Sequence, residues 1–294
     1  MSTMADPSPL LPSIDTTPIP KGRLSVTPNL LQAKLVNALR ADANALYLAG
    51  AFVPGGLRRR RPNNENKKDN VKTTTNADET DETTRVCDVC GLFDDAENAD
   101  DAVGNRNARE DLFDLMSDLR EMLERELHVK LLESMELQYL RYPGSNRNNN
   151  DATKKNKGFY GRHFDRTSDD ATTCQRKISL LLYLNADGWN AETDGGVLRA
   201  YIRPKNANNE SISVQDVVPE GGKLVLFDSS SVEHEVLPTC KERWAVVGWF
   251  LSEKGAARRG GGGGDGGKKR SHHSGEEQMS SSKRKKKKKR RKGR

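Results

Sequence analysis

The stretch Gly158-Phe-Tyr-Gly-Arg-His-Phe-Asp165 sets a histidine and a carboxylate two residues apart in a segment of extended, β-like composition. Because side chains alternate between the two faces of a strand, His163 and Asp165 are expected on one face and Phe164 on the other. A His-x-Asp triplet also arises by chance, and alone it is equally typical of a solvated turn or strand end. The pair therefore needs a further partner elsewhere in the chain before it indicates a site.

A second segment, from Ser231 to Phe250, supplies such a partner. It places His234 sixty-nine residues after Asp165. Two histidines and one carboxylate form a facial triad that leaves metal positions open, as in non-haem Fe(II) oxygenases. We therefore take His163, Asp165 and His234 as candidate iron ligands.

Arg243 follows nine residues after His234 and begins an expected strand. On that strand it shares a face with Ala245, Val247 and Trp249, so its guanidinium would enter an apolar interior. A buried cation is unfavourable there unless a carboxylate meets it. An acidic cosubstrate would supply this carboxylate.

Seven short motifs carry a resemblance to a known family. They are, in order, Arg141-Tyr-Pro-Gly144, Tyr160-Gly-Arg-His-Phe-Asp165, Leu182-Tyr-Leu-Asn185, Gly195-Gly-Val-Leu-Arg199, Leu224-Val-Leu-Phe-Asp228, His234-Glu-Val and Arg243-Trp-Ala. From about Gln138 to Leu251 the chain resembles the Fe(II)- and 2-oxoglutarate-dependent prolyl 4-hydroxylases. It is most similar to the oxygen-sensing branch that acts on hypoxia-inducible factor.

The resemblance implies Fe(II), 2-oxoglutarate and ascorbate as cofactors, and dioxygen as a reactant. It also implies hydroxylation of a prolyl ring carbon in a bound peptide, with oxidative decarboxylation of 2-oxoglutarate to succinate and CO2. Arg243 and Tyr183 would share the far carboxylate of 2-oxoglutarate, and Tyr142 would lie near the iron. Trp249 and Arg162 are expected as peptide contacts, with barrel packing or a surface salt bridge as the alternative for each.

The second half of the chain predicts a set of short strands split by Gly, Pro and polar turns. They begin near Met135 and continue with Ile178–Asn185, Val197–Ile202, Val214–Val218, Lys223–Phe227, His234–Leu237 and Arg243–Leu251. Strands of this kind are typical of a double-sheet jelly roll, or double-stranded β-helix. Helices are expected from an Asn29 cap to Leu48, stopped by Gly50, and from Arg109 to Leu127. The expected fold is mainly β with flanking helices.

The composition limits how much of the chain can pack. Hydrophobic residues make up 34% and charged residues 31%, which favours one domain with unstructured flanks. We expect a disordered leader (1–27), a dioxygenase domain (28–253) and a Gly-rich, polybasic tail (254–294). Within the domain we expect a helical support (28–134) with a polar insertion (58–84), followed by the jelly-roll core (135–253).

The basic character of the chain belongs to its tail. Eleven Lys or Arg lie between Lys283 and Arg294, and subtracting them from the net charge of +7 leaves −4 for the rest. Such a run predicts a nuclear import signal, with nonspecific nucleic-acid contact as a second use. No secretory leader and no apolar run of roughly 20 residues is found. We therefore expect a proline-containing protein substrate in the nucleus or cytoplasm, and no membrane partner.

Four cysteines without a secretory leader favour reduced thiols. The spacing of Cys87 and Cys90 would allow both to bind one zinc ion, but a closed site needs two further ligands that the neighbouring sequence does not supply. A short strand with free thiols is the favoured interpretation.

Two other functions remain open from the sequence. One is an oxygenase with the same metal ligands that acts on lysyl, nucleic-acid or small-molecule substrates. The other is a noncatalytic jelly-roll protein associated with nucleic acid, which the presence of all three candidate ligands and Arg243 disfavours.

Overall fold

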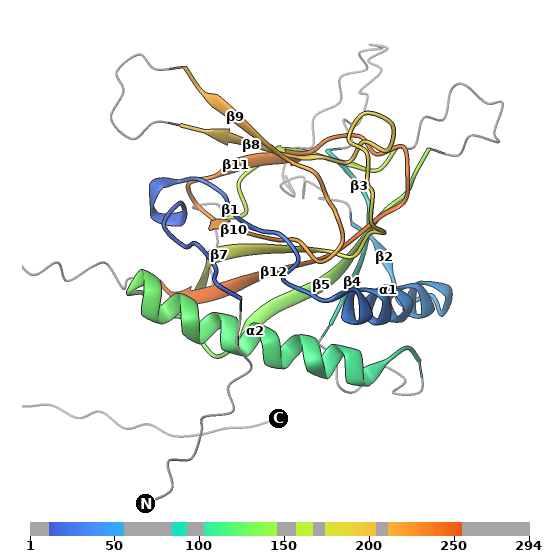
Figure 1. The fold of residues 1–294 in the computed structure, drawn as a ribbon, viewed down its shortest axis with the longest axis horizontal. Coiled ribbons are helices and arrows are strands. Elements are labelled where there is room, and N and C mark those ends of the chain that lie inside the picture. The colour runs from blue at the N-terminus through green and yellow to red at the C-terminus, as the bar shows by residue number, and fades with distance from the viewer. Residues whose placement is uncertain are drawn as a thin grey trace, which may run out of the picture. The chain divides into compact units, whose positions relative to one another are not determined.

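The computed structural model describes residues 12–55, 84–92, 103–145, 157–166, 174–203 and 211–254. In this part of the chain, two antiparallel sheets are flanked by two α-helices (Figure 1). The expected mainly β fold with flanking helices is confirmed, and the two stacked sheets are those of a jelly roll. The elements in chain order are η1 (Ile19–Lys21), β1 (Ser25–Thr27), α1 (Ala33–Leu48), β2 (Val53–Pro54), β3 (Arg85–Val86), β4 (Asp88–Gly91), α2 (Arg106–Leu127), β5 (Met135–Tyr142), β6 (Phe159–His163), β7 (Cys174–Tyr183), β8 (Leu198–Ile202), β9 (Ser213–Val217), β10 (Leu224–Asp228), β11 (Glu233–Val236) and β12 (Arg243–Glu253).

The two sheets are built almost wholly from pairings between distant parts of the chain. The larger sheet has seven strands in the order β1-β10-β7-β12-β5-β4-β2, and the smaller has five in the order β3-β6-β11-β8-β9. Strand β12 lies between β7 and β5 and pairs with both along most of its length. The last strand of the domain is therefore at the centre of the larger sheet.

Two hydrophobic cores lie on opposite faces of the larger sheet. The helix-covered core packs α1 and α2 against one face, through residues such as Leu39, Leu119 and Val246. Figure 1 shows both helices along that face. The inter-sheet core fills the space toward the smaller sheet, through residues such as Tyr183 and Phe227. Because side chains alternate along each strand, every long strand contributes to both cores.

Helix α1 begins later than the sequence predicts. Asn29 has φ +53° instead of capping the helix, and the first helical residue, Ala33, follows Gln32, whose side chain makes no capping hydrogen bond. The N–H of Leu31 instead donates to the carbonyl of Gly222 at 3.1 Å, so the segment before the helix is bound to the turn that precedes β10. The helix ends as predicted, before Gly50 at φ +81°.

The prediction of a disordered leader through Thr27 is wrong for residues 12–27, because this segment contains η1 and β1. Strand β1 pairs with β10, with Ser25 opposite Leu226 and Thr27 opposite Leu224. A three-residue strand has no detectable periodicity, and its partner lies about 200 residues away in the chain, so the local sequence could not reveal it. Residues 1–11 of the predicted leader lie outside the described residues.

Helix α2 starts three residues before the predicted Arg109. The side chain of Asn105 caps it by accepting a hydrogen bond from the N–H of Ala108 at 3.2 Å. The buried Asp42 of α1 accepts hydrogen bonds from the N–H of Asn105 and, at 2.8 Å, from the phenol of Tyr139 on β5. This one carboxylate therefore ties both helices to the larger sheet.

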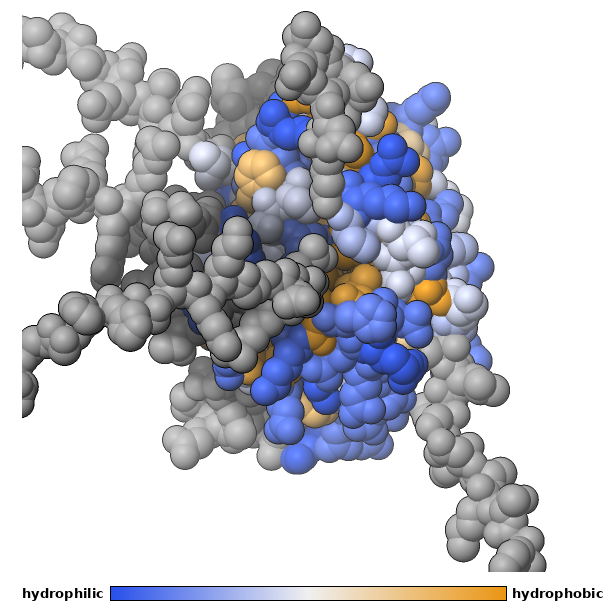
Figure 2. Space-filling model, turned by 90° about the vertical axis from the view of Figure 1, so that its left-hand side faces the viewer, coloured by the Kyte–Doolittle hydropathy of each residue, from blue (hydrophilic) through white to orange (hydrophobic). Residues whose placement is uncertain are grey.

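The predicted polar insertion (58–84) and tail (254–294) lie outside the described residues except for one boundary residue each. On the face shown in Figure 2, the described surface is mainly hydrophilic, with hydrophobic residues in small separate patches. None of the described helices combines the length and apolar character needed to cross a bilayer.

Candidate metal centre and active site

The pairing of β6 with β11 brings the two candidate histidines together. His163 and His234 are opposite each other in this antiparallel pair, with their ring centroids 4.3 Å apart. The next register pair joins Tyr160 to Val236, so between the two pairs β6 advances by three positions and β11 by only two. This β-bulge rotates the end of β6 and turns His163 to the same side as Tyr160.

Asp165 completes the group from just beyond the end of β6. The prediction that the strand continues through this residue is wrong, because β6 ends at His163. The carboxylate nevertheless reaches both rings: its Oδ1 lies 3.5 Å from Nε2 of His163 and 3.8 Å from Nε2 of His234. The three ligand atoms lie within 4.8 Å of one another. In the described part of the chain, they form the one group of three or more His, Cys, Asp or Glu that could hold a metal ion.

Main-chain carbonyls orient both imidazoles for metal binding. Nδ1 of His163 lies 2.7 Å from the carbonyl oxygen of Gly161, and Nδ1 of His234 lies 3.2 Å from that of Val232. A proton on each Nδ1 makes these contacts hydrogen bonds and leaves the Nε2 lone pair directed at Asp165. Two imidazole nitrogens and one carboxylate oxygen on one side of a common point are the donor set expected for Fe(II).

The environment also favours the protonation states that a metal needs. Burial alone would raise the pKa of Asp165, but when the two histidines are protonated, the charge of His234 and a hydrogen bond from His163 outweigh burial and lower that pKa. Burial lowers the pKa of His234, against the opposing effect of the Asp165 charge. An ionised carboxylate and a neutral imidazole are the forms that bind metal.

Arg243 is a completely buried cation with unused hydrogen-bond donors. It has an exposed fraction of 0%, and its Nε, Nη1 and Nη2 have no hydrogen-bond partner among the described residues. The guanidinium carbon lies 4.9 Å from the ring centroid of Tyr142 and 5.0 Å from that of Tyr183. The phenol oxygen of Tyr183 is likewise buried without a described partner.

Burying a charge without a partner costs free energy. The unused N–H donors of Arg243 therefore indicate a ligand that supplies the missing acceptor. A carboxylate fits best, because guanidinium binds it through two parallel hydrogen bonds. Burial raises the pKa of Tyr183 to about 12 despite the nearby charge of Arg243, so the phenol stays protonated and can donate to the same carboxylate. The residues present therefore fit one end of 2-oxoglutarate.

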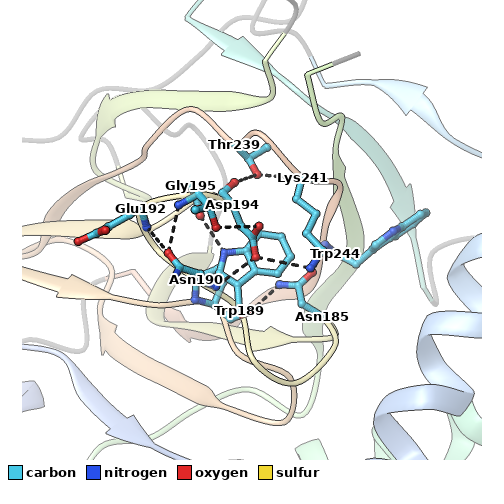
Figure 3. Close-up of polar contacts among 11 residues, drawn as sticks. Asn185, Trp189, Asn190, Glu192, Asp194, Gly195, Thr239, Lys241 and Trp244 are labelled. Carbon is cyan, nitrogen blue, oxygen red and sulfur yellow. Dashed lines mark hydrogen bonds and ion pairs between the residues drawn. The ribbon is translucent and has the colours of Figure 1, made fainter. Parts of the chain in front are cut away.

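Figure 3 shows two loops in contact: one carries Trp189, Asp194 and Gly195, and the other carries Thr239 and Lys241. From the loop before β12, the hydroxyl of Thr239 donates to the carbonyl of Asp194 at 3.1 Å, and Nζ of Lys241 lies 3.5 Å from the carboxylate of Asp194. Gly196 has φ +67°, and a Cβ there would lie 2.9 Å from Cδ of Arg243. The loop before β8 therefore needs glycine at this point to pack against the arginine.

Residues 146–251 match the family model described as "2OG-Fe(II) oxygenase superfamily". The chain carries a 2OG-Fe(II) oxygenase domain. Among curated proteins, a 95-residue segment is 33% identical to "Hypoxia-inducible factor prolyl hydroxylase" of Caenorhabditis elegans. The match spans 32% of this chain but only 12% of that relative's length.

Solved structures of prolyl hydroxylases share the fold of the oxygenase domain. A prolyl-4-hydroxylase from Pseudomonas putida is 29% identical, with a TM-score of 0.53 over 77% of this chain and 91% of that one. A prolyl hydroxylase from Trichoplax adhaerens, solved with a peptide fragment of the oxygen degradation domain of hypoxia inducible factor, is 22% identical. Its TM-score is 0.51 over 78% of this chain and 83% of that one, a likeness of fold alone.

The two predicted peptide contacts lie in different places in the oxygenase domain. Trp249 is in the inter-sheet core, where its indole Nε1 has no described partner and the guanidinium carbon of Arg176 lies 3.4 Å from its ring centroid. Arg162 is on the other side of β6 from His163 and pairs with Glu233 at 2.8 Å. Arg162 thus occupies a surface salt bridge, and a peptide contact for either residue stays a prediction.

Tyr160 is a residue of the site that simple strand alternation misses. Its ring stacks on that of His163 at a centroid separation of 3.6 Å, and the guanidinium carbon of Arg85 lies 4.5 Å from the Tyr160 centroid. Tyr160 and His163 are three positions apart in the sequence, so a regular strand would place them on opposite faces. Gly161 between them was the available signal, since glycine inside a strand often marks a bulge.

The zinc alternative for the cysteine pair does not fit the structure. Cys87 belongs to the inter-sheet core and Cys90 to the helix-covered core, so their side chains lie on opposite faces of the sheet. Both thiols are free and buried, and burial raises both pKa values. Cys87 directly precedes the short strand β4 and Cys90 lies within it, which agrees with the favoured interpretation of a short strand with free thiols.

Proposed function

We propose that this chain is a peptidyl-prolyl 4-hydroxylase that uses Fe(II), dioxygen and 2-oxoglutarate, with ascorbate as a further cofactor. The observation that carries the proposal is the buried Arg243, whose guanidinium has no described partner, in a domain whose described residues contain one candidate metal group, His163, Asp165 and His234. A structural arginine in a protein interior would be expected to meet a carboxylate of its own chain. Here the acceptor would come from the cosubstrate.

Each part of the site has a separate task in this proposal. Fe(II) and 2-oxoglutarate, when bound, supply the oxidising chemistry that places one oxygen atom of dioxygen on the substrate while 2-oxoglutarate becomes succinate and CO2. His163, Asp165 and His234 would hold the metal on one side and leave the other side open. Arg243 and the Tyr183 phenol would anchor the far carboxylate, and Tyr142 would close the pocket beside them.

The prolyl substrate is supported by relatives and by the aromatic surroundings of the metal group. The similar proteins from Caenorhabditis elegans and Pseudomonas putida are both named as prolyl hydroxylases, and the Trichoplax adhaerens structure holds a peptide. In this chain, Tyr160 stacks on His163, and Trp249 in the inter-sheet core offers an indole N–H that has no partner among the described residues. Flat rings would suit the compact, apolar ring of proline, and the N–H would suit a peptide carbonyl.

The iron ligands are tested by replacing Asp165 with Ala. We expect succinate production to fall below detection, because two imidazoles alone do not retain the metal, while the far-UV circular dichroism of the protein stays unchanged. The matched control is Asp194→Ala, which alters a carboxylate of the oxygenase domain outside the metal group. Retained turnover in the Asp165 variant contradicts the ligand set.

The substrate class is tested with proline-containing peptides. The enzyme is incubated with iron, ascorbate and 2-oxoglutarate, first with a peptide library and then with cell lysate. Addition of one oxygen atom, mapped to proline by mass spectrometry, supports the proposal. Addition to lysine, to a nucleic acid or to a small molecule assigns the same metal site to a different substrate.

We also place this activity in the nucleus or cytoplasm and include an oxygen-sensing role in the proposal. The polybasic run Lys283–Arg294 supports nuclear import, and the resemblance to the oxygen-sensing branch supports the role. A fluorescent fusion that loses nuclear accumulation when residues 283–294 are deleted supports import. Unchanged accumulation assigns the run to another use, such as nucleic-acid contact.

A further inference from the structure

The side chain of Arg243 is held in place by packing, because its guanidinium makes no hydrogen bond to the described residues. Its main chain is fixed by the pairing of β12 with β5, in which Arg243 is opposite Tyr142. Its guanidinium carbon lies 4.9 Å from the ring centroid of Tyr142 and 5.0 Å from that of Tyr183. A long side chain that is held in this way depends on how rigid its neighbours are.

Gly196 and Thr239 support the arginine from the loops beside it. A Cβ on Gly196 would lie 2.9 Å from Cδ of Arg243 and 3.0 Å from Oγ1 of Thr239. The main chain of Gly196 therefore fits between the arginine and the threonine, with no room for a methyl group. It is fixed there by its N–H, which donates to the carbonyl of Pro238 at 3.2 Å. Thr239 has an exposed fraction of 0%.

The carbonyl of Asp194 accepts hydrogen bonds from three successive residues of the loop before β12. The donors are the hydroxyl of Thr239 at 3.1 Å, the N–H of Cys240 at 2.7 Å and the N–H of Lys241 at 3.2 Å. Figure 3 shows Thr239 and Lys241 next to Asp194. The Thr239 hydroxyl also lies 2.5 Å from the carbonyl of Lys241, so its single proton lies between two acceptors. Thr239 contributes the one side chain among these three donors, and a substitution can remove it without altering the backbone.

Thr239 also connects this loop to the strand that carries the first candidate metal ligand. Its N–H donates at 2.9 Å to the carbonyl of Gly158, directly before β6, which ends at His163. Along the chain, Thr239 follows His234 by five positions and precedes Arg243 by four. The threonine is therefore placed where it can fix the spacing between the metal group and the guanidinium.

We propose that Thr239 is a positioning residue for the binding of 2-oxoglutarate. Its buried hydroxyl holds the loop that contains Asp194 and Gly196 against the side chain of Arg243, and so keeps the guanidinium directed into the pocket before the cosubstrate arrives. A group that is already ordered loses less conformational freedom on binding, which raises the affinity. Thr239 acts through Arg243, and this role rests on the function proposed above. The part of Asp194 that is involved is its main-chain carbonyl, which Asp194→Ala retains.

The test measures the Kd of 2-oxoglutarate for the full chain saturated with Mn(II), without peptide and without turnover, by equilibrium dialysis. We expect Thr239→Val to raise this Kd by about 5-fold, the effect of one hydrogen bond. Thr239→Ser keeps the hydroxyl and should bind 2-oxoglutarate nearly as the wild type does. The affinity for Mn(II) alone should be the same in all three proteins, because the metal group is unchanged.

A second background separates positioning from a merely structural role. In a chain that already carries Arg243→Met, adding Thr239→Val should not raise the Kd further, because the threonine acts through the arginine. A merely structural threonine would lower the melting temperature and leave the Kd unchanged, or would raise the Kd by the same factor in both backgrounds.

Gly196→Ala tests the same contact from the other loop. The added methyl would meet Cδ of Arg243, and alanine is strained at φ +67°, so we expect the Kd of 2-oxoglutarate to rise by about 10-fold or more. The control is Lys241→Ala, which removes an ion pair to Asp194 from a side chain that is 49% exposed. It should leave both the Kd and the melting temperature unchanged, because exposed ion pairs contribute little.

Three results would overturn the positioning role: wild-type affinity in Thr239→Val, an equal loss in Thr239→Ser, or the same further loss in the Arg243→Met background. If Thr239→Val does not fold, Gly196→Ala decides, and wild-type affinity in that variant overturns the role. Failure of the proposed function gives a different result. In that case the wild-type chain does not bind 2-oxoglutarate, or Arg243→Met binds it equally well.

Discussion

Two tryptophans on strand β12 face opposite sides of the same sheet and differ in what their indole N–H groups do. Trp244, in the helix-covered core, donates from Nε1 to the carboxylate of Glu242 at 3.0 Å. Trp249, in the inter-sheet core, has a buried Nε1 without a partner among the described residues. One strand thus contributes to a core in which the buried indole N–H is hydrogen-bonded and to a second core in which it has no described partner.

Buried charges show the same difference. Asp42, in the helix-covered region, accepts hydrogen bonds from Tyr139 and Asn105 and lies 3.8 Å from Nε of Arg109. Arg243, at the inter-sheet face, has no such partner among the residues that the structure describes. Since folded proteins satisfy nearly all buried polar groups, the unsatisfied ones identify where a ligand belongs. In the proposed function, the helix-covered core stabilises the fold, and the inter-sheet core would be completed by the cosubstrate.

The strongest test of this difference is Asp42→Ala. It leaves Tyr139, Asn105 and Arg109 without their shared acceptor, so the free energy of unfolding should fall by about 3 kcal/mol. The KM for 2-oxoglutarate of the folded fraction should not change. Urea unfolding of the metal-free protein measures the loss of stability, and initial rates measure the KM for 2-oxoglutarate. Normal stability with a raised KM would make Asp42 part of the active site and remove the distinction.

Arg243→Met should behave in the opposite way. We expect the KM for 2-oxoglutarate to rise by about 100-fold, or about 2.7 kcal/mol, because the carboxylate loses its charged anchor. The metal-free protein should be at least as stable as the wild type, since a buried charge without a partner has been removed. Arg243→Lys is the control and should bind 2-oxoglutarate at an intermediate level. A loss of stability similar to that of Asp42→Ala would show that Arg243 has a structural partner.

Tyr183→Phe sharpens the comparison within the pocket. Its hydroxyl has no described protein partner, so removing it should leave the free energy of unfolding nearly unchanged. The KM for 2-oxoglutarate should rise by about 10-fold, the effect of one hydrogen bond to a charged group. Tyr139→Phe, which removes a phenol bonded to Asp42, is the matched control and should lose stability instead. Equal effects of both variants on the KM for 2-oxoglutarate would contradict the assignment of Tyr183 to the 2-oxoglutarate pocket.

The smallest expected effect separates the two tryptophans. Trp244→Phe should lower the free energy of unfolding by about 1 kcal/mol more than Trp249→Phe, because only Trp244 loses a hydrogen bond to its own chain. Trp249→Phe should instead raise the KM for a peptide substrate. Thermal unfolding and peptide kinetics test this pair, and an unchanged peptide KM would remove Trp249 from the substrate contacts.

The sequence predicted the jelly roll correctly and pointed to the three residues of the candidate metal group, because both depend on local patterns. Apolar runs between turn residues located most of the core strands, and the His-x-Asp and later His motifs pointed to three residues that the structure brings together. Predictions failed where a distant partner overrides local preference. Asn29 does not cap α1, because the N–H of Leu31 donates to the carbonyl of Gly222. The predicted leader contains β1, because this segment pairs with β10.

By itself, the sequence determined which chemical groups are available: two imidazoles, one carboxylate, and an arginine on an apolar strand. Tertiary structure alone decided that the bulge at Gly161 turns His163 and Tyr160 to one side. It also decided that, within the described part of the chain, Asp42 has hydrogen-bond partners while the guanidinium of Arg243 has none. The physical reason is that strand register, bulges and hydrogen-bond partners are set by pairing between segments far apart in the chain, which no local pattern records.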